Sequence, residues 1–72
     1  MSKIRIVIAS VPDRDKLVAE LWFGDAQWAE LSNDLGDLIL QIYANPTGQP
    51  WEFSPEDVVD SLQRAKSALL CA

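Results

Sequence analysis

The segment LVAELWFGDAQWAELS, residues 17–32, decides how this chain folds. Its apolar and polar side chains alternate on both sides of the central Gly24-Asp25 pair, which is the period of a β-strand buried on one face. Glycine adopts a positive φ at no steric cost, so this pair is typical of a tight hairpin turn. The segment therefore predicts two antiparallel strands, residues 17–23 and 27–32.

The register of this hairpin has two solutions, which differ in the face that Trp28 and Glu30 occupy. A two-residue turn pairs Leu21 with Trp28 and places Trp28 and Glu30 on the same face as Leu21. An odd-length loop or a bulge near Asp25 or Ala26 places them on the opposite face. We favour the bulge, because burying Glu30 without a partner is expensive.

Two more strands are predicted outside the hairpin. Between Lys3 and Ala9 every second residue is isoleucine, and from Leu38 to Tyr43 two sets of side chains again alternate. Charged and proline residues interrupt the chain after the first of these strands, and residues 33–36 form a second turn before the last one. A four-stranded antiparallel meander is the economical arrangement.

The strongest local signal is FSPEDV, residues 53–58, which marks the start of a helix. Ser54 suits the N-cap, Pro55 suits the first helical position, and Phe53 and Val58 are spaced as a hydrophobic staple. The apolar stripe expected to lie across the sheet is Val58, Leu62, Ala65 and Leu69. The predicted fold is a single α+β domain over residues 1–72, ββββα, with one C-terminal helix packed on one face of the sheet.

The favoured register separates the side chains of the sheet into two faces. The face toward the helix is expected to be apolar and to comprise Ile4, Ile6, Ile8, Leu17, Ala19, Leu21, Phe23, Ala29, Leu31, Leu38, Leu40 and Ile42. The other face is expected to be aromatic and acidic, because it carries Glu20, Trp22, Trp28 and Glu30. Trp51 is expected to pack under the start of the helix.

Charge is distributed one-sidedly along the chain. From Leu17 to Asp60 there are nine carboxylates and no Lys or Arg, within a chain of net charge −5. Most of these carboxylates have local structural roles, at turns, at the N-terminal end of the helix, or in an i,i+4 pair between Asp60 and Arg64. Glu20 and Glu30 lie in mid-strand and are left as functional candidates. The acidic charge also argues against binding to nucleic acid.

Several classes of function lack the residues that they need. The chain has no histidine and a single cysteine, Cys71, so catalytic residues, a metal site and a cofactor are not expected. We read Cys71 as a terminal residue with no assigned role. The apolar runs are far shorter than the roughly 20 residues that span a bilayer, so no membrane association is expected. A cytoplasmic, non-enzymatic protein is the expectation.

The part of the chain from Gln27 to Leu70 resembles small bacterial proteins of unknown function. The resemblance is carried by QWAELS, LILQIY, GQPWEF and a helix with the pattern V-x-x-x-L-x-x-A-K. The size and charge of those proteins are similar to those of toxin-immunity proteins. The resemblance implies a binding role and assigns no functional residue.

Two functions are consistent with these features. The first is a protein-binding module of the immunity or antitoxin type that occludes a basic surface of its partner. Its expected partner-binding residues are Glu20, Trp22, Trp28, Glu30, Asp34 and Asp37. The alternative is a homodimeric structural or accessory domain that pairs through the aromatic face or an edge strand and has no inhibitory activity.

Overall fold

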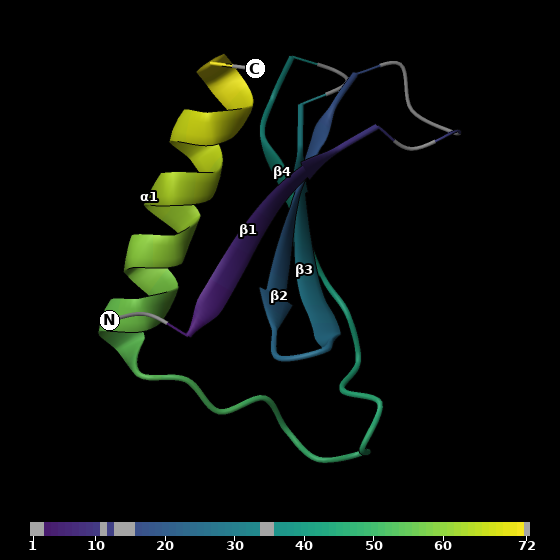
Figure 1. Ribbon diagram of the computed structural model, residues 1–72, viewed down its shortest axis with the longest axis vertical. Coiled ribbons are helices and arrows are strands. Elements are labelled where there is room, and N and C mark those ends of the chain that lie inside the picture. The colour runs from purple at the N-terminus through teal and green to yellow at the C-terminus, as the bar shows by residue number, and fades with distance from the viewer. Residues whose placement is uncertain (1–2, 11, 13–15, 34–35, 72) are drawn as a thin grey trace.

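The computed structural model confirms the predicted ββββα architecture (Figure 1). It describes residues 3–10, 12, 16–33 and 36–71. The elements are β1 (Ile4–Ala9), β2 (Val18–Phe23), β3 (Ala26–Ser32), β4 (Ile39–Ile42) and α1 (Pro55–Cys71). The strands form one antiparallel sheet in the order β1-β2-β3-β4, so β1 and β4 are its edges.

The β2–β3 hairpin contains both a two-residue turn and a bulge. Phe23 pairs with Ala26 across Gly24-Asp25, but Leu21 pairs with Ala29, so Trp28 is the extra residue on β3. The bulge was correctly expected, although it lies at Trp28 and not near Asp25 or Ala26. It keeps Ala29 and the rest of β3 in the register that the alternating pattern requires.

The bulge also turns Trp28 into the core, which corrects the expected placement of this residue. Trp28 is 4% exposed and packs with the buried residues between the sheet and the helix. Its ring centroid lies 4.8 Å from that of Phe53, in the segment leading into α1. The prediction that Trp28 lies on the face opposite the helix is therefore wrong. The reason is that a bulged residue does not follow the strict alternation of its strand.

Gly24 has φ 62°, which L-residues with a Cβ adopt at a cost. Replacement by alanine is expected to reduce the free energy of unfolding by about 1–2 kcal/mol, measured by urea denaturation. No atom lies within 4 Å of the added Cβ, so the effect comes from the backbone alone. Asparagine tolerates this conformation better, and Gly24→Asn should lose less. An unchanged stability in Gly24→Ala would show that the turn does not need a positive φ.

α1 begins where the sequence predicts. The Ser54 hydroxyl accepts a hydrogen bond from the Asp57 backbone N–H at 3.2 Å, which is N-cap geometry. Phe53 and Val58 both pack against the core. Trp51 also packs there as expected, with its ring stacked 5.9 Å from that of Phe53 and its indole N–H donating to the Tyr43 carbonyl oxygen at 2.8 Å.

The buried face of α1 consists of Ser61, Ala65 and Leu69, flanked by the partly buried Val58 and Leu62. Ser61 does not belong to the predicted apolar stripe. It is accommodated because its hydroxyl donates to the Val58 carbonyl oxygen at 2.9 Å, so no polar group is left unpaired. Small side chains on this face allow the helix to approach the sheet closely.

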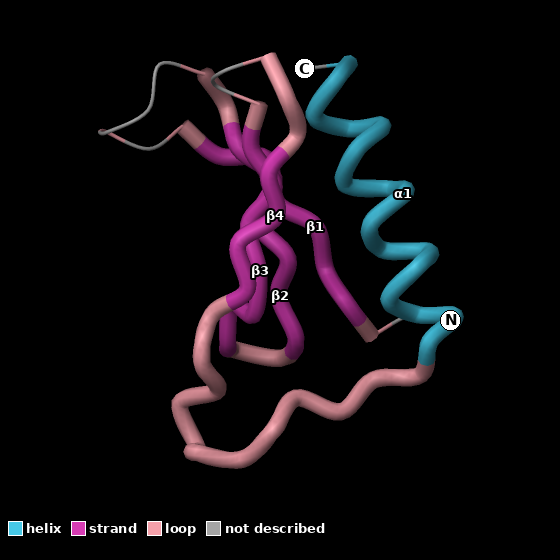
Figure 2. The backbone as a smooth tube through the Cα atoms, turned by 180° about the vertical axis from the view of Figure 1, so that it is seen from behind, coloured by secondary structure: helices cyan, strands magenta, loops and turns pink. Residues whose placement is uncertain are grey.

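The helix covers only part of the sheet. α1 packs on β1 and β2, approaches β3 at fewer positions, and does not approach β4 within the described residues. Figure 2 shows β1 as the strand that lies beside the helix. The helix is fixed to the β1 edge by Arg64, which donates to the Ile4 carbonyl oxygen at 3.2 Å and pairs with Asp60 at 2.8 Å. The predicted pair between Asp60 and Arg64 is thus confirmed.

Candidate functional site

The face of the sheet opposite α1, called the outer face below, holds part of the predicted binding surface. The strand register aligns Glu20 with Glu30 across β2 and β3, and aligns Glu30 with Gln41 on β4. Trp22 donates a hydrogen bond from Nε1 to Oε1 of Glu20 at 3.1 Å, and the guanidinium of Arg5 lies 5.7 Å from its ring centroid. The structure therefore brings Glu20, Trp22 and Glu30 together on one face.

This outer face presents less acidic surface than the sequence suggests. Glu30 is only 7% exposed, and Glu20 and Trp22 are partly buried and bound to each other. Arg5 adds a positive charge beside them. Trp28 lies in the core, Asp37 is exposed at the bend before β4, and Asp34 lies outside the described residues.

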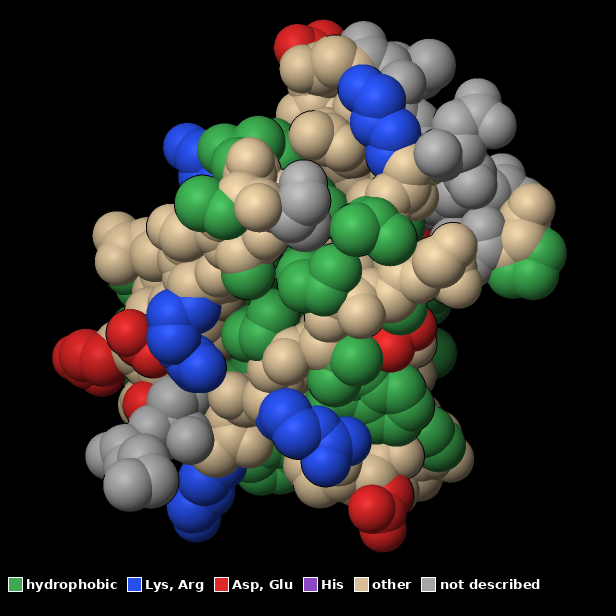
Figure 3. Space-filling model, turned by 45° about the horizontal axis from the view of Figure 1, so that its top comes forward, with side chains coloured by type: hydrophobic (Ala, Val, Ile, Leu, Met, Phe, Trp, Pro, Cys, Tyr) green, Lys and Arg blue, Asp and Glu red, His purple; other side chains and the backbone are tan. Residues whose placement is uncertain are grey.

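The surface around β1 and α1 is not acidic either. The side of the molecule shown in Figure 3 has hydrophobic side chains across its middle, with Lys and Arg side chains beside them and carboxylates separated from one another. No continuous acidic face results on this side of the molecule.

A different surface stands out, at the half of the sheet that α1 leaves uncovered. Leu40 and Ile42 pair with Leu31 and Ala29 of β3 and so point to the helix side, as predicted, yet they are 38% and 64% exposed. Leu38 continues the alternation and is also exposed. These side chains were expected to be covered by the helix. They are not, because one helix spans only two of the four strands.

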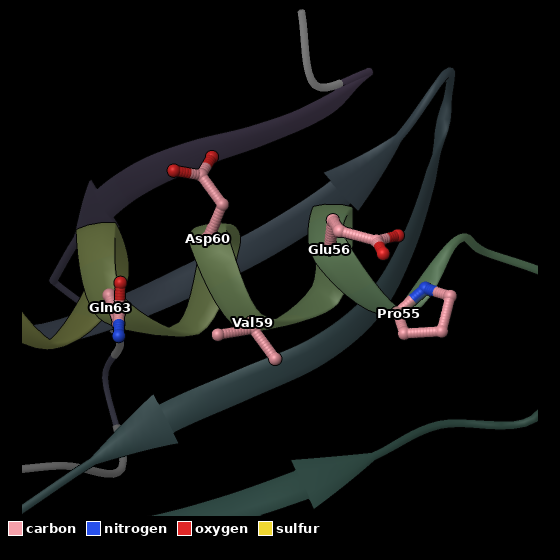
Figure 4. A pocket seen from close by; sticks show the side chains of 5 residues that line it. All are labelled: Pro55, Glu56, Val59, Asp60 and Gln63. Atoms are coloured by element: carbon pink, nitrogen blue, oxygen red, sulfur yellow. The ribbon is translucent and has the colours of Figure 1, made fainter.

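The flank of α1 that borders this half carries two exposed apolar side chains, with the exposed Lys66 between them at helical spacing. Arg64 contacts β1 from one flank of α1. Val59 and Leu70 lie on the opposite flank, which faces the side of β3 and β4. Figure 4 shows Val59 pointing to that side and Asp60 pointing toward β1. Val59 and Leu70 are 55% and 58% exposed. We call Leu38, Leu40, Ile42, Val59 and Leu70 the apolar half-face.

The apolar half-face is large for a domain of this size. Its five side chains are between 38% and 64% exposed, and exposed apolar patches on monomers are often functional. The segment from Leu38 to Trp51 also contains no charged residue. Edge strands usually carry a charge or a proline that discourages pairing, and β4 carries neither. The absence of charged residues from this segment is the sequence feature that could have predicted this surface.

Two depressions on the surface of the described residues are less suited to a specific ligand. One, of about 380 Å³, lies on the solvent side of α1 and is lined by Pro55, Glu56, Val59, Asp60 and Gln63. The other, of about 350 Å³, lies between the hairpin turn and the segment before α1 and is lined by Phe23, Ala26, Asn45, Thr47, Pro50, Trp51 and Glu52. In the second, Asn45 Oδ1 already accepts hydrogen bonds from the N–H and hydroxyl of Thr47.

The described residues form neither a metal cluster nor a membrane-spanning helix. Among residues 3–10, 12, 16–33 and 36–71, no three His, Cys, Asp or Glu side chains are grouped so that they could hold a metal ion. In the same residues, no helix has both the length and the hydropathy to cross a bilayer. Cys71 is exposed at the end of α1 and is not disulfide-bonded.

Comparison of the chain with protein-family models, with curated proteins and with solved structures finds no match.

Proposed function

We propose that this chain is a small protein-binding module that binds its partner through the apolar half-face. The observation that carries the proposal is the exposure of Leu40 and Ile42 on the side of the sheet that a helix normally covers. Burial of apolar surface is the main favourable term in protein association, and interface centres are poor in charge. The segment that includes β4 exposes apolar side chains and carries no charge, so it suits the centre of an interface.

A protein suits this surface better than a small molecule does. Small-molecule sites are concave and enclose most of their ligand. The apolar half-face is open and extends over a strand and the flank of a helix. A broad partner surface can cover such a region, and no reactive group of this chain is needed for it.

The finer proposal is an inhibitor of the immunity or antitoxin type, whose partner is basic. It is supported by the net charge of −5 and by the exposed carboxylate of Asp37, which directly precedes Leu38 and β4. Charges at the rim of an interface raise the association rate and the specificity more than the affinity. The alternative, a homodimeric accessory domain without inhibitory activity, would use the same apolar residues.

Site-specific photo-cross-linking in native cell lysate tests the proposal. A benzophenone amino acid in place of Ile42 is expected to form covalent adducts with a discrete partner protein, because Ile42, at 64%, is the most exposed residue of the apolar half-face. The same probe in place of Lys3, exposed at the far edge of the sheet, is the matched control and should form none. Loss of the adduct at high salt would identify a basic partner, and an adduct of twice the chain mass would identify a homodimer.

The proposal would be contradicted if the Ile42 probe formed no adduct, or if the Lys3 probe formed the same adducts in equal yield. Folding of both probe-bearing chains is checked by circular dichroism before the comparison. Neither substitution removes a residue of the buried core.

A further inference from the structure

We infer that two copies of this chain pair through the open edges of their β4 strands, which joins their sheets into one antiparallel sheet. The two edges of the sheet differ in how they are protected. At the β1 edge, the Arg64 guanidinium donates to the Ile4 carbonyl oxygen at 3.2 Å, and Arg5 places a charge in the strand. Among the described residues, β4 contacts β3 and no other helix or strand, and it is exposed and uncharged. β4 is therefore the edge to which another strand can be added.

The outward backbone groups of β4 belong to Leu40 and Ile42. The Tyr43 backbone N–H donates to the Trp28 carbonyl oxygen at 2.9 Å, so the backbone of Tyr43 is turned toward β3. Backbone groups of successive residues in a strand point alternately to one neighbouring strand and to the other. Those of Gln41 therefore also point to β3, and the N–H and C=O groups of Leu40 and Ile42 point to the open edge.

A two-fold axis at Gln41 matches these outward groups to one another. It places Leu40 of one copy opposite Ile42 of the other, and the two residues of such a pair exchange both of their backbone hydrogen bonds. The symmetry repeats this pair on the other side of the axis, as an isologous interface requires. An axis at Leu40 or at Ile42 would keep only one hydrogen-bonded pair within β4. The register centred on Gln41 therefore satisfies the most backbone groups of the strand.

The side chains that meet in this register are compatible on both faces of the sheet. On the helix side, Leu40 lies beside Ile42 of the other copy. On the outer face, Ile39 lies beside Tyr43 of the other copy, and cross-strand pairs of aromatic and β-branched residues stabilise sheets. No like charges oppose each other across β4, because the strand has no charged residue. Two copies that each have a net charge of −5 can therefore approach at this edge.

Edge pairing leaves the apolar half-face accessible. The two β4 strands lie side by side in one sheet, so the helix side of each strand stays open, and the two half-faces become neighbours between the two α1 helices. The inference is therefore independent of the proposed function. Either one can fail in its own experiment while the other stands.

Disulfide trapping in a Cys71→Ser background tests the register. Gln41→Cys places a thiol at the two-fold axis, where the Cα atoms of a non-hydrogen-bonded pair are about 4.5 Å apart, within the range that a disulfide spans. Ile39→Cys is the matched control on the same strand and the same face, and it lies roughly 13 Å from its counterpart, four residues along the strand. Under mild oxidation, we expect the Gln41→Cys dimer to form at least tenfold faster.

Sedimentation equilibrium of the unaltered chain under reducing conditions measures the pairing itself. We expect a monomer–dimer equilibrium that strengthens at higher salt, because salt screens the repulsion between two copies of the same net charge. Gln41→Lys opposes two ammonium groups at the axis and should weaken the dimer at least tenfold. Ile39→Lys makes the same change of charge opposite Tyr43 and should weaken the dimer less than threefold.

Three results would overturn the inference. They are a chain that stays monomeric at millimolar concentration, trapping of Ile39→Cys as fast as that of Gln41→Cys, and an equal loss of dimer in the two lysine variants. Circular dichroism of each variant establishes that it is folded before the comparison. All of the substituted residues are exposed, so none of these changes removes a residue of the buried core.

Discussion

Trp28→Ala is expected to reduce the free energy of unfolding by about 3–5 kcal/mol, as large aromatic truncations in cores do. A domain of this length has a total stability of roughly 4–11 kcal/mol, so this one substitution would remove a large share of it. The reason is the position of Trp28, which is 4% exposed and contacts the ring of Phe53, itself in contact with Phe23 at 5.0 Å. Removing the indole leaves a cavity under the start of α1. Urea denaturation followed by far-ultraviolet circular dichroism measures the effect.

Two further variants separate packing from other effects of Trp28. Trp22→Ala is the matched control on the neighbouring strand, and it should lose only about 1 kcal/mol, because it removes a partly exposed ring with its contacts to Glu20 and Arg5. Trp28→Phe keeps most of the ring. Within the described residues the buried Trp28 Nε1–H has no acceptor, so phenylalanine gives up no hydrogen bond and should be much better tolerated than alanine. Equal losses in Trp22→Ala and Trp28→Ala would contradict the register of the bulge.

Ala65→Asp is expected to release α1 from the sheet and unfold the domain. Ala65 is fully buried against the sheet, and a carboxylate there would have to lose its hydration without gaining a partner. The expected loss exceeds about 4 kcal/mol, at the upper end of single-residue effects. Size-exclusion chromatography and thermal unfolding, read by circular dichroism, measure this change.

Gln63→Asp is the control for the helix itself. Gln63 is exposed on the same helix, so this variant introduces the same residue with a similar helix-propensity cost of about 0.5 kcal/mol but without burial. The difference between the two variants reports how strongly α1 is held on β1 and β2. If Ala65→Asp were as stable as Gln63→Asp, α1 would not pack as described.

Local sequence patterns predict most of the fold of this chain because they act over short distances. Alternation predicts each strand, and Ser54 and Pro55 predict the start of α1 within one residue. The position of the bulge is not predictable in this way. It depends on the packing of Trp28 against Phe53, two residues that are distant in sequence and adjacent only in the folded chain.

The candidate site was predicted less well than the fold. The outer face does bring Glu20, Trp22 and Glu30 together, but Glu30 is nearly buried and Trp28 belongs to the core. The alternating pattern places Leu40 and Ile42 on the helix side but does not say which strands the helix covers. That choice follows from tertiary contacts, such as Arg64 with the Ile4 carbonyl oxygen, that no single segment encodes.

The proposed binding surface requires the helix side of β4 to be open in the free chain. Methyl NMR with a soluble paramagnetic agent measures this openness, because the agent broadens the signals of methyl groups that solvent reaches. We expect strong broadening for Leu40, Ile42 and Val59, weak broadening for the buried Leu21 and Leu31, and the same values in dilute and concentrated samples. Protection of Leu40 and Ile42 equal to that of Leu21 in a dilute sample would show that this side of β4 is covered in the monomer.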